Sequence, residues 1–117
     1  MSGICFFKTK DLKTLKDFYT KRLNMKVWVD QGSCVILRSE SFLIGFCESD
    51  KVENNGIVTR FFKTRDEVDE VFSKLEDIST CKPRENEKYK IYQFFGKDPD
   101  GRTLEFQAFL HDLDWSF

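Results

Sequence analysis

A short internal repeat constrains the fold of this chain more than any other feature of its sequence. Residues 6–11 read FFKTKD, and residues 61–66, displaced by 55 positions, read FFKTRD. After each copy, apolar residues recur at helical spacing, and the strand-like segments that follow come in the same order. A chain rich in lysine and phenylalanine can match itself by chance, but the agreement of the following elements favours duplication of one structural unit.

Each half of the chain is predicted to contain one strand, one helix and three further strands. In the first half, the apolar periodicity indicates strands at 3–9, 25–30, 33–38 and 42–48 and a helix at 11–23, which Thr9 or Asp11 can cap. In the second half, a strand over the second repeat copy precedes a helix that carries Val68, Val71, Phe72 and Leu75, and strands follow at 81–82, 88–95 and 103–109. The fold class is therefore α+β, with two tandem βαβββ modules. We expect a single domain over 1–117, with module one at about 1–50 and module two at about 56–110.

The segment DPDGRTLEFQAF, from Asp98 to Phe109, joins a tight turn to a half-buried strand. Proline at the second position and glycine at the fourth suit a reversal in which Gly101 leaves at positive φ. Leu104 and Phe106 alternate with polar residues, so Glu105 points away from the apolar face in mid-strand. An unpaired carboxylate is costly to bury there, which makes this polar face the first place to look for a functional site.

The composition argues against several kinds of partner. The chain has 19 basic and 20 acidic residues and a formal net charge of −1, which gives no electrostatic reason to expect nucleic acid or an anionic membrane. No apolar run approaches the ~20 residues of a membrane helix, and the first ten residues lack a signal-peptide pattern, so we expect a soluble cytoplasmic protein. The four cysteines show no CxxC spacing, and we expect them to be free, mostly buried thiols in a reducing compartment rather than disulfide or metal-binding residues.

Two motifs carry a family resemblance. DLxxLxxFYxxxLxM runs from Asp11 to Met25, and DPDGxxLE runs from Asp98 to Glu105. Together with the paired βαβββ modules, which cover nearly the whole chain, they resemble the vicinal oxygen chelate superfamily, which includes glyoxalases, bleomycin-resistance proteins, extradiol dioxygenases and fosfomycin-modifying enzymes. The resemblance implies a curved mixed sheet from each module with the helices outside, and a cup-shaped cavity where the sheets meet, commonly completed by a second subunit.

The resemblance also implies where a metal would bind. Metal-dependent members take one ligand near the start of the first strand and one from the last strand of each module, usually His, Gln or Glu. Here these positions fall on Ile4, Gly45, Thr59 and Glu105. Only Glu105 is a good donor, whereas zinc, nickel or iron needs several imidazole or carboxylate ligands together. We therefore expect no metal and no cofactor.

A shifted register does not readily restore a metal site. The only histidine, His111, lies in a polar tail beside Asp112 and Asp114, where a surface residue is expected. Cys47 shares the strand face of Gly45, but Cys5 does not share that of Ile4.

What remains is a predicted small-molecule cavity. Strand parity, with the aromatic residues of the second module added, gives the candidate ligand-binding residues as Phe6, Cys47, Thr59, Phe61, Tyr92, Phe94, Glu105 and Gln107. Tyr89, Phe95 and Trp28 add flat surface, and Glu105 offers a counter-charge for a planar or cationic ligand. For any one phenylalanine the alternative is a place in the hydrophobic core.

Glu105 has two interpretations. It can be an inherited position bonded to a neighbouring lysine or tyrosine, with Lys8 and Lys63 as candidate partners, or it can be a catalytic general base. The first predicts a metal-independent binding protein similar in kind to the bleomycin-resistance proteins. The second predicts a glyoxalase-type lyase or a thiol transferase, so the sequence leaves open whether the protein is an enzyme. A third alternative is an interaction module whose cavity Phe6, Phe61 and Phe94 have filled.

The resemblance favours a homodimer, because one short chain leaves a sheet face of each module to be covered. The end of the chain, from His111 to Phe117, alternates Leu113, Trp115 and Phe117 with polar residues. We expect this tail to dock on a partner subunit or at the mouth of the cup, with a disordered tail as the alternative.

Overall fold

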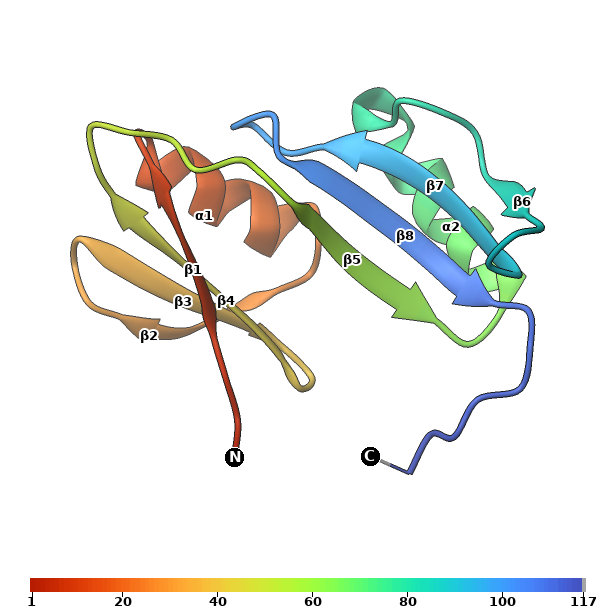
Figure 1. The fold of residues 1–117 in the computed structure, drawn as a ribbon. Coiled ribbons are helices and arrows are strands. Elements are labelled where there is room, and N and C mark those ends of the chain that lie inside the picture. The colour runs from red at the N-terminus through yellow and green to blue at the C-terminus, as the bar shows by residue number, and fades with distance from the viewer. Residues whose placement is uncertain (117) are drawn as a thin grey trace. The chain divides into compact units, whose positions relative to one another are not determined.

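The computed structural model describes residues 1–116 and divides the chain into two compact units. The first unit contains Met1–Asn55 and the loop Asp98–Gly101, and the second contains Gly56–Lys97 and the chain from Arg102 onward. The first unit has strand β1 (Cys5–Thr9), helix α1 (Leu12–Lys21) and strands β2 (Lys26–Asp30), β3 (Cys34–Ser39) and β4 (Phe42–Glu48). The second has β5 (Ile57–Phe62), α2 (Arg65–Leu75) with a short 3₁₀ turn η1 (Glu76–Ile78), β6 (Arg84–Asn86), β7 (Ile91–Lys97) and β8 (Thr103–Phe109). The predicted α+β class and the tandem βαβββ pattern are confirmed (Figure 1).

Each unit contains one mixed four-stranded sheet. The strand orders are β1-β4-β3-β2 and β5-β8-β7-β6. The first strand of each module runs parallel to the last, and the other neighbours are antiparallel. One helix packs on one face of each sheet, and most of the buried apolar side chains of the strands point to that face. The fully buried residues include Leu15, Tyr19, Leu37, Ile44 and Phe46 in the first unit and Val68, Leu75, Phe94, Leu104 and Phe106 in the second. We call the opposite side of each sheet the helix-free face.

Two strand predictions in the second module are wrong at their starts. The short strand expected at 81–82 begins only after Pro83, at Arg84, and residues 79–80 contact β7 through an isolated bridge from Ser79 to Gly96. The strand expected from 88 begins at Ile91, because the preceding residues form a turn that ends with Lys90 at φ 54. A left-handed residue interrupts the extended backbone that a strand needs.

The sequence repeat has a displacement of 55 residues, but structurally equivalent residues of the two modules lie 53 positions apart. The side chain of Asp11 caps α1 and that of Thr64 caps α2, which is a displacement of 64 − 11 = 53 positions rather than 55. The strands before them end at Thr9 and Phe62, again 53 apart. The structural counterpart of Phe6 is therefore Thr59. Side chains alternate between the two faces of a strand, so an error of two residues in the displacement leaves each residue on its predicted face.

The two family-like motifs meet at a buried hydrogen bond in the first unit. The hydroxyl of Tyr19, on α1, donates to Oδ2 of Asp98 at 2.7 Å, and both residues are buried. Within the turn, the amide of Asp100 donates to Oδ1 of Asp98 at 2.9 Å, and Gly101 adopts φ 77 as predicted. The hydrogen bond from Tyr19 thus fixes the loop that precedes β8.

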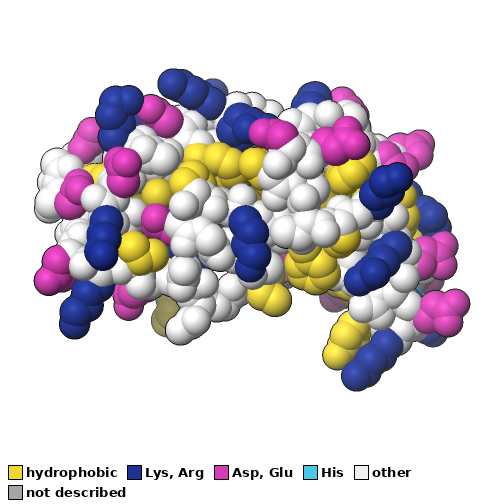
Figure 2. Space-filling view, turned by 90° about the horizontal axis from the view of Figure 1, so that it is seen from above, with side chains coloured by type: hydrophobic (Ala, Val, Ile, Leu, Met, Phe, Trp, Pro, Cys, Tyr) yellow, Lys and Arg dark blue, Asp and Glu magenta, His cyan; other side chains and the backbone are white. Residues whose placement is uncertain are grey.

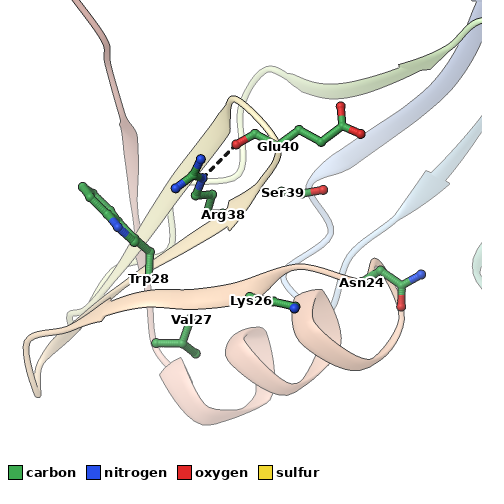
Figure 3. Close-up of a pocket in the computed structure, with 7 residues that line it drawn as sticks. All are labelled: Asn24, Lys26, Val27, Trp28, Arg38, Ser39 and Glu40. Atoms are coloured by element: carbon green, nitrogen blue, oxygen red, sulfur yellow. Dashed lines mark hydrogen bonds between the residues drawn. The ribbon is translucent and has the colours of Figure 1, made fainter.

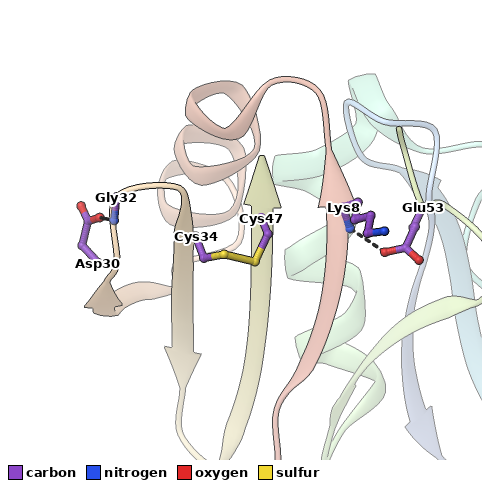
Figure 4. Close-up of a disulfide and its surroundings, with 6 residues drawn as sticks. All are labelled: Lys8, Asp30, Gly32, Cys34, Cys47 and Glu53. Atoms are coloured by element: carbon purple, nitrogen blue, oxygen red, sulfur yellow. Dashed lines mark hydrogen bonds between the residues drawn. A yellow bond between two sulfur atoms is a disulfide. The ribbon is translucent and has the colours of Figure 1, made fainter. Parts of the chain in front are cut away.

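Two of the four cysteines are paired, which contradicts the expectation that all are free thiols. Cys34 on β3 and Cys47 on β4 lie directly opposite each other in the antiparallel register, with their Cα atoms 4.0 Å apart, and form a disulfide (Figure 4). Cys5 and Cys81 are free. The sequence could not show this pair, because its spacing becomes meaningful only once the register is known. The cysteines therefore no longer support a reducing compartment.

Gly96 on β7 allows the segment after α2 to pass close to the sheet. A Cβ atom on Gly96 would lie 2.8 Å from Cδ1 and 2.9 Å from the backbone oxygen of Ile78. Because a backbone atom cannot rotate away, we predict that Gly96→Ala lowers the free energy of unfolding by about 1–3 kcal/mol, the usual cost of overpacking. Equilibrium chemical denaturation measures this change. Gly3→Ala is the control, since nothing lies within 4 Å of that position, and equal stabilities of the two variants would contradict the prediction.

Candidate functional site

Glu105 stands in the middle of β8, on the helix-free face of the second sheet, where a network of neutral side chains holds it. Its Cα partners are Thr59 on the parallel strand β5 and Phe95 on the antiparallel strand β7. The hydroxyl of Thr59 donates to Oε1 at 2.7 Å, and the Nε2 amide of Gln93 donates to Oε2. Gln93 in turn accepts a hydrogen bond of 3.0 Å from Nδ2 of Asn86. Three strands therefore fix the orientation of this carboxylate.

The partners of Glu105 differ from those expected. Lysine or tyrosine was predicted, with Lys8 and Lys63 as candidates, but the carboxylate accepts from a hydroxyl and an amide. Within residues 1–116, no cationic side chain contacts its oxygens. Neutral donors orient a carboxylate without cancelling its charge, so Glu105 remains able to attract a cation.

A pocket of about 610 Å³ opens over this network, within the range of small-molecule sites. Its lining mixes apolar and aromatic side chains with polar ones, and its charged groups other than Glu105 are Arg84 and Glu85, both exposed. Glu85 also forms an ion pair with Arg65. The pocket is lined by Ile57, Arg84, Glu85, Asn86, Tyr89, Ile91, Gln93, Phe95 and Glu105.

The corresponding positions in the first unit carry no donor atoms. Phe6 on β1 is the Cα partner of Gly45 on β4, as Thr59 is of Glu105. A Cβ atom on Gly45 would lie 2.4 Å from two ring carbons of Phe6, so the phenylalanine ring occupies the space above the glycine. Ile4 precedes β1 and has no place in this pairing. An aromatic ring over a glycine thus replaces, in module one, the polar pair of module two.

This set of residues does not fit a divalent metal. Among the four positions, one carboxylate and one neutral hydroxyl are available, and the two are bonded to each other. The second carboxylate oxygen is engaged by Gln93. In the part of the chain that the structure describes, no group of three or more His, Cys, Asp or Glu side chains is arranged to hold a metal ion. Zinc, nickel or iron needs several such donors together.

The predicted ligand-binding residues fall into three groups. Thr59, Phe61, Glu105 and Gln107 share the helix-free face of the second sheet, with Phe61 opposite Gln107 in the register. Phe6 and Cys47 lie on the helix-free face of the first sheet, where Cys47 is in the disulfide. Tyr92 and Phe94 have the opposite strand parity and point toward α2.

The two residues that face α2 have other roles. Phe94 is fully buried, with its ring stacked on Phe106 at a centroid distance of 4.8 Å, so it belongs to the core. Tyr92 donates a 2.6 Å hydrogen bond to Asp69 and lies under the guanidinium of Arg65 at 4.2 Å. The hydrogen bond to Asp69 raises the pKa of Tyr92, because it stabilises the neutral phenol. This cluster ties the start of α2 to β7.

Sequence reasoning missed the two amides of the network. Gln93 interrupts the aromatic run of β7, and a polar residue in mid-strand is the signal that pointed to Glu105 on β8. Asn86 could not be found in this way, because β6 was predicted in the wrong place. Its contact with Gln93 depends on the β6–β7 pairing.

In the tail that follows β8, Trp115 packs on the second unit. Trp115 stacks on Phe61 at a centroid distance of 5.7 Å and meets the edge of Phe109 at 6.3 Å. His111 is exposed beside Phe109, as a surface residue was expected to be. Phe117 lies outside the described residues. The aromatic tail therefore extends the apolar surface of the helix-free face.

Comparison with known proteins identifies the fold. The structure matches a glyoxalase/bleomycin resistance protein/dioxygenase from Nocardioides with a TM-score of 0.80 and 13% identity, covering 100% of this chain and 88% of that one. It matches an integron cassette protein from the mobile metagenome of the Halifax Harbour sewage outfall with a TM-score of 0.80 and 20% identity, covering 92% and 97%. A lactoylglutathione lyase from Agrobacterium tumefaciens gives a TM-score of 0.76 at 15% identity, covering 92% of each chain.

The chain has the vicinal oxygen chelate fold. The expected resemblance is thereby confirmed at the level of structure. No protein-family model and no curated protein sequence matches the chain. At such low identities a vicinal oxygen chelate fold specifies the scaffold alone, and the function must be argued from the side chains.

The surface and the helices add two observations. On the face that Figure 2 shows, acidic and basic side chains are interspersed rather than gathered by sign, in agreement with the small net charge. No helix within the described residues is long and apolar enough to cross a membrane.

Thr59 offers a direct test of the network. Thr59→Val removes one of the two donors to Glu105 and leaves a half-buried carboxylate oxygen without its protein partner. We predict a loss of about 1–2 kcal/mol in the free energy of unfolding, the usual cost of such a deletion. In a Glu105→Leu background, the same substitution should have little effect, since no carboxylate remains to be satisfied. A double-mutant cycle by chemical denaturation measures the coupling, and additive effects would contradict the network.

Proposed function

We propose that this protein binds a small molecule with a planar apolar body and a positive charge, without the help of a metal ion. The observation that carries the proposal is the environment of Glu105, whose carboxylate is oriented by neutral donors beside a pocket of small-molecule size. In a half-buried site, an organic cation is the natural partner of such a group.

The walls of the pocket favour a flat ligand. Tyr89 is 59% exposed and Phe95 lies beside Glu105 in the register, so both offer aromatic surface next to the charge. Aromatic rings attract cations through their negative faces and stack on planar groups. Phe61 and Gln107 continue this face along the strands. The proposed binding residues are therefore Tyr89, Gln93, Phe95 and Glu105, which line the pocket, with Thr59, Phe61 and Gln107 beside them on the same sheet face.

The donor set supports the metal-independent part of the proposal. Among the solved structures with this fold is a lactoylglutathione lyase, and the sequence left such chemistry open as an alternative. A lyase of the metal-dependent kind requires a Lewis acid, but Phe6 and Gly45 offer no ligands and Glu105 is the only carboxylate at the four positions. A binding function needs only the pocket and its charge.

Titration with a planar cation tests the proposed function. Proflavine should bind at one site per chain, and Glu105→Gln should weaken it by about tenfold or more, the value of one charge-assisted contact. Glu70→Gln is the matched control, since Glu70 is an exposed residue of α2 outside the pocket, and it should bind as the wild type does. Calorimetry measures both affinities.

Three outcomes would contradict the proposal. The first is equal affinity of the wild type and Glu105→Gln for proflavine. The second is one tightly held ion per chain, found by elemental analysis after incubation with zinc, nickel, manganese and iron. The third is turnover of a hemithioacetal that disappears in Glu105→Gln. The last result would establish the lyase alternative.

We also propose that the protein works as a homodimer. Phe6 and Phe61 are each 48% exposed and Ile57 is 58% exposed, all on helix-free faces. A second copy would bury such surface and further exclude water from the pocket. Light scattering at micromolar concentration should give the mass of a dimer, and a monodisperse monomer would contradict this part of the proposal.

A further inference from the structure

A second pocket lies in the first unit, on the edge strand β2, and has no part in the function proposed above. It has a volume of about 470 Å³ and combines an exposed indole with two cationic side chains. The strand order places β2 at the end of its sheet, so the pocket is open along one side. It is lined by Asn24, Lys26, Val27, Trp28, Arg38, Ser39 and Glu40 (Figure 3).

A β-bulge presents Trp28 to this pocket. The register between β2 and β3 passes from Val27 opposite Leu37 to Val29 opposite Ile36, so Trp28 has no Cα partner. Its side chain is 53% exposed, and within the described residues it makes no ring contact. In Figure 3 the indole and Arg38 project to the same side of the strands, whereas Val27 points toward α1. The bulge thus leaves an aromatic face open to a ligand.

Arg38 is oriented for an anion. Its Nε donates to the backbone oxygen of Glu40 at 2.9 Å, which fixes the guanidinium, and in the described part of the chain its terminal nitrogens have no partner. Figure 3 shows the Glu40 side chain running away from Arg38, so only its carbonyl makes the contact. A guanidinium held at Nε still presents two donors side by side, which match the two oxygens of a carboxylate or phosphate.

Lys26 adds a second positive charge. Its Cα lies directly opposite that of Arg38 in the sheet register, and no ion pair involves it among residues 1–116. The pocket therefore has two cationic side chains against one carboxylate, that of Glu40. This balance is the opposite of that around Glu105, where the ligand is expected to be cationic.

We propose that this pocket binds a small planar aromatic anion, with the ring against Trp28 and the anionic group on Arg38 and Lys26. The volume suits one fused ring system with its substituent. The anionic group is a carboxylate or a phosphate, because the guanidinium recognises both in the same way. No residue lines both this pocket and the pocket at Glu105, so we expect the two ligands not to compete.

Calorimetric titration of the full chain with naphthoate, naphthol and adenosine monophosphate tests this site. Naphthoate should bind at one site, and naphthol, which lacks the charge, should bind about tenfold more weakly. Arg38→Gln and Trp28→Leu should each weaken naphthoate about tenfold, whereas Trp28→Phe should keep most of the affinity because it keeps an aromatic face. Saturable binding of adenosine monophosphate would show that the site accepts a phosphate as well as a carboxylate, and its absence beside binding of naphthoate would assign the site to carboxylates.

Two control variants separate this site from general charge effects and from the Glu105 pocket. Lys51→Gln removes a positive charge elsewhere in the first unit, and Glu105→Gln alters the other pocket, so both should leave the affinity for naphthoate unchanged. The inference is wrong if naphthol binds as tightly as naphthoate, if Arg38→Gln and Trp28→Leu bind as the wild type does, or if neither anion gives saturable binding.

Discussion

The parallel pairing of the first and last strands in each module is the constraint on which the candidate site depends. It places β1 beside β4 and β5 beside β8, and it decides which residues from opposite ends of a module become neighbours. In the second module the neighbours are Thr59 and Glu105, and in the first they are Phe6 and Gly45. One topology therefore yields a polar, anionic centre in one sheet and an aromatic ring over a glycine in the other. The backbone is shared and the chemistry differs, so side chains rather than the fold decide the function.

Much of the fold could be predicted because it rests on local patterns. The alternation of Leu104 and Phe106 with polar residues gave the bounds of β8, and the sequence DPDG gave the turn before it, with Gly101 at positive φ. Features that depend on pairing between distant strands were harder to predict. The Cys34–Cys47 disulfide depends on the β3–β4 register, and the start of β6 depends on its contact with β7. The repeat gave the correct strand faces although its displacement was two residues too large, because faces depend only on parity.

Part of the candidate site could also be predicted from local sequence patterns. Glu105 was visible as a polar residue in mid-strand, and Thr59 was named with it, although as the counterpart of Ile4 rather than of Phe6. Its other partner was missed because a charged group was expected to seek an opposite charge. The structure instead uses Gln93 and, behind it, Asn86. Neutral donors hold the carboxylate in place while leaving its charge for a ligand. The bulge at Trp28 likewise depends on how β2 meets β3, so the second pocket could not be read from the sequence.

The central claim is that the Glu105 network itself, without a metal ion, is the binding site for a planar cation. Solution NMR of the side-chain amides during titration with proflavine measures this most directly, because Gln93 and Asn86 each carry an observable NH₂ group in the network. Saturable shifts of these two amides in metal-free buffer, absent in Glu105→Gln, are the predicted result. Shifts confined to residues outside the network, or binding that requires added zinc, would contradict the account.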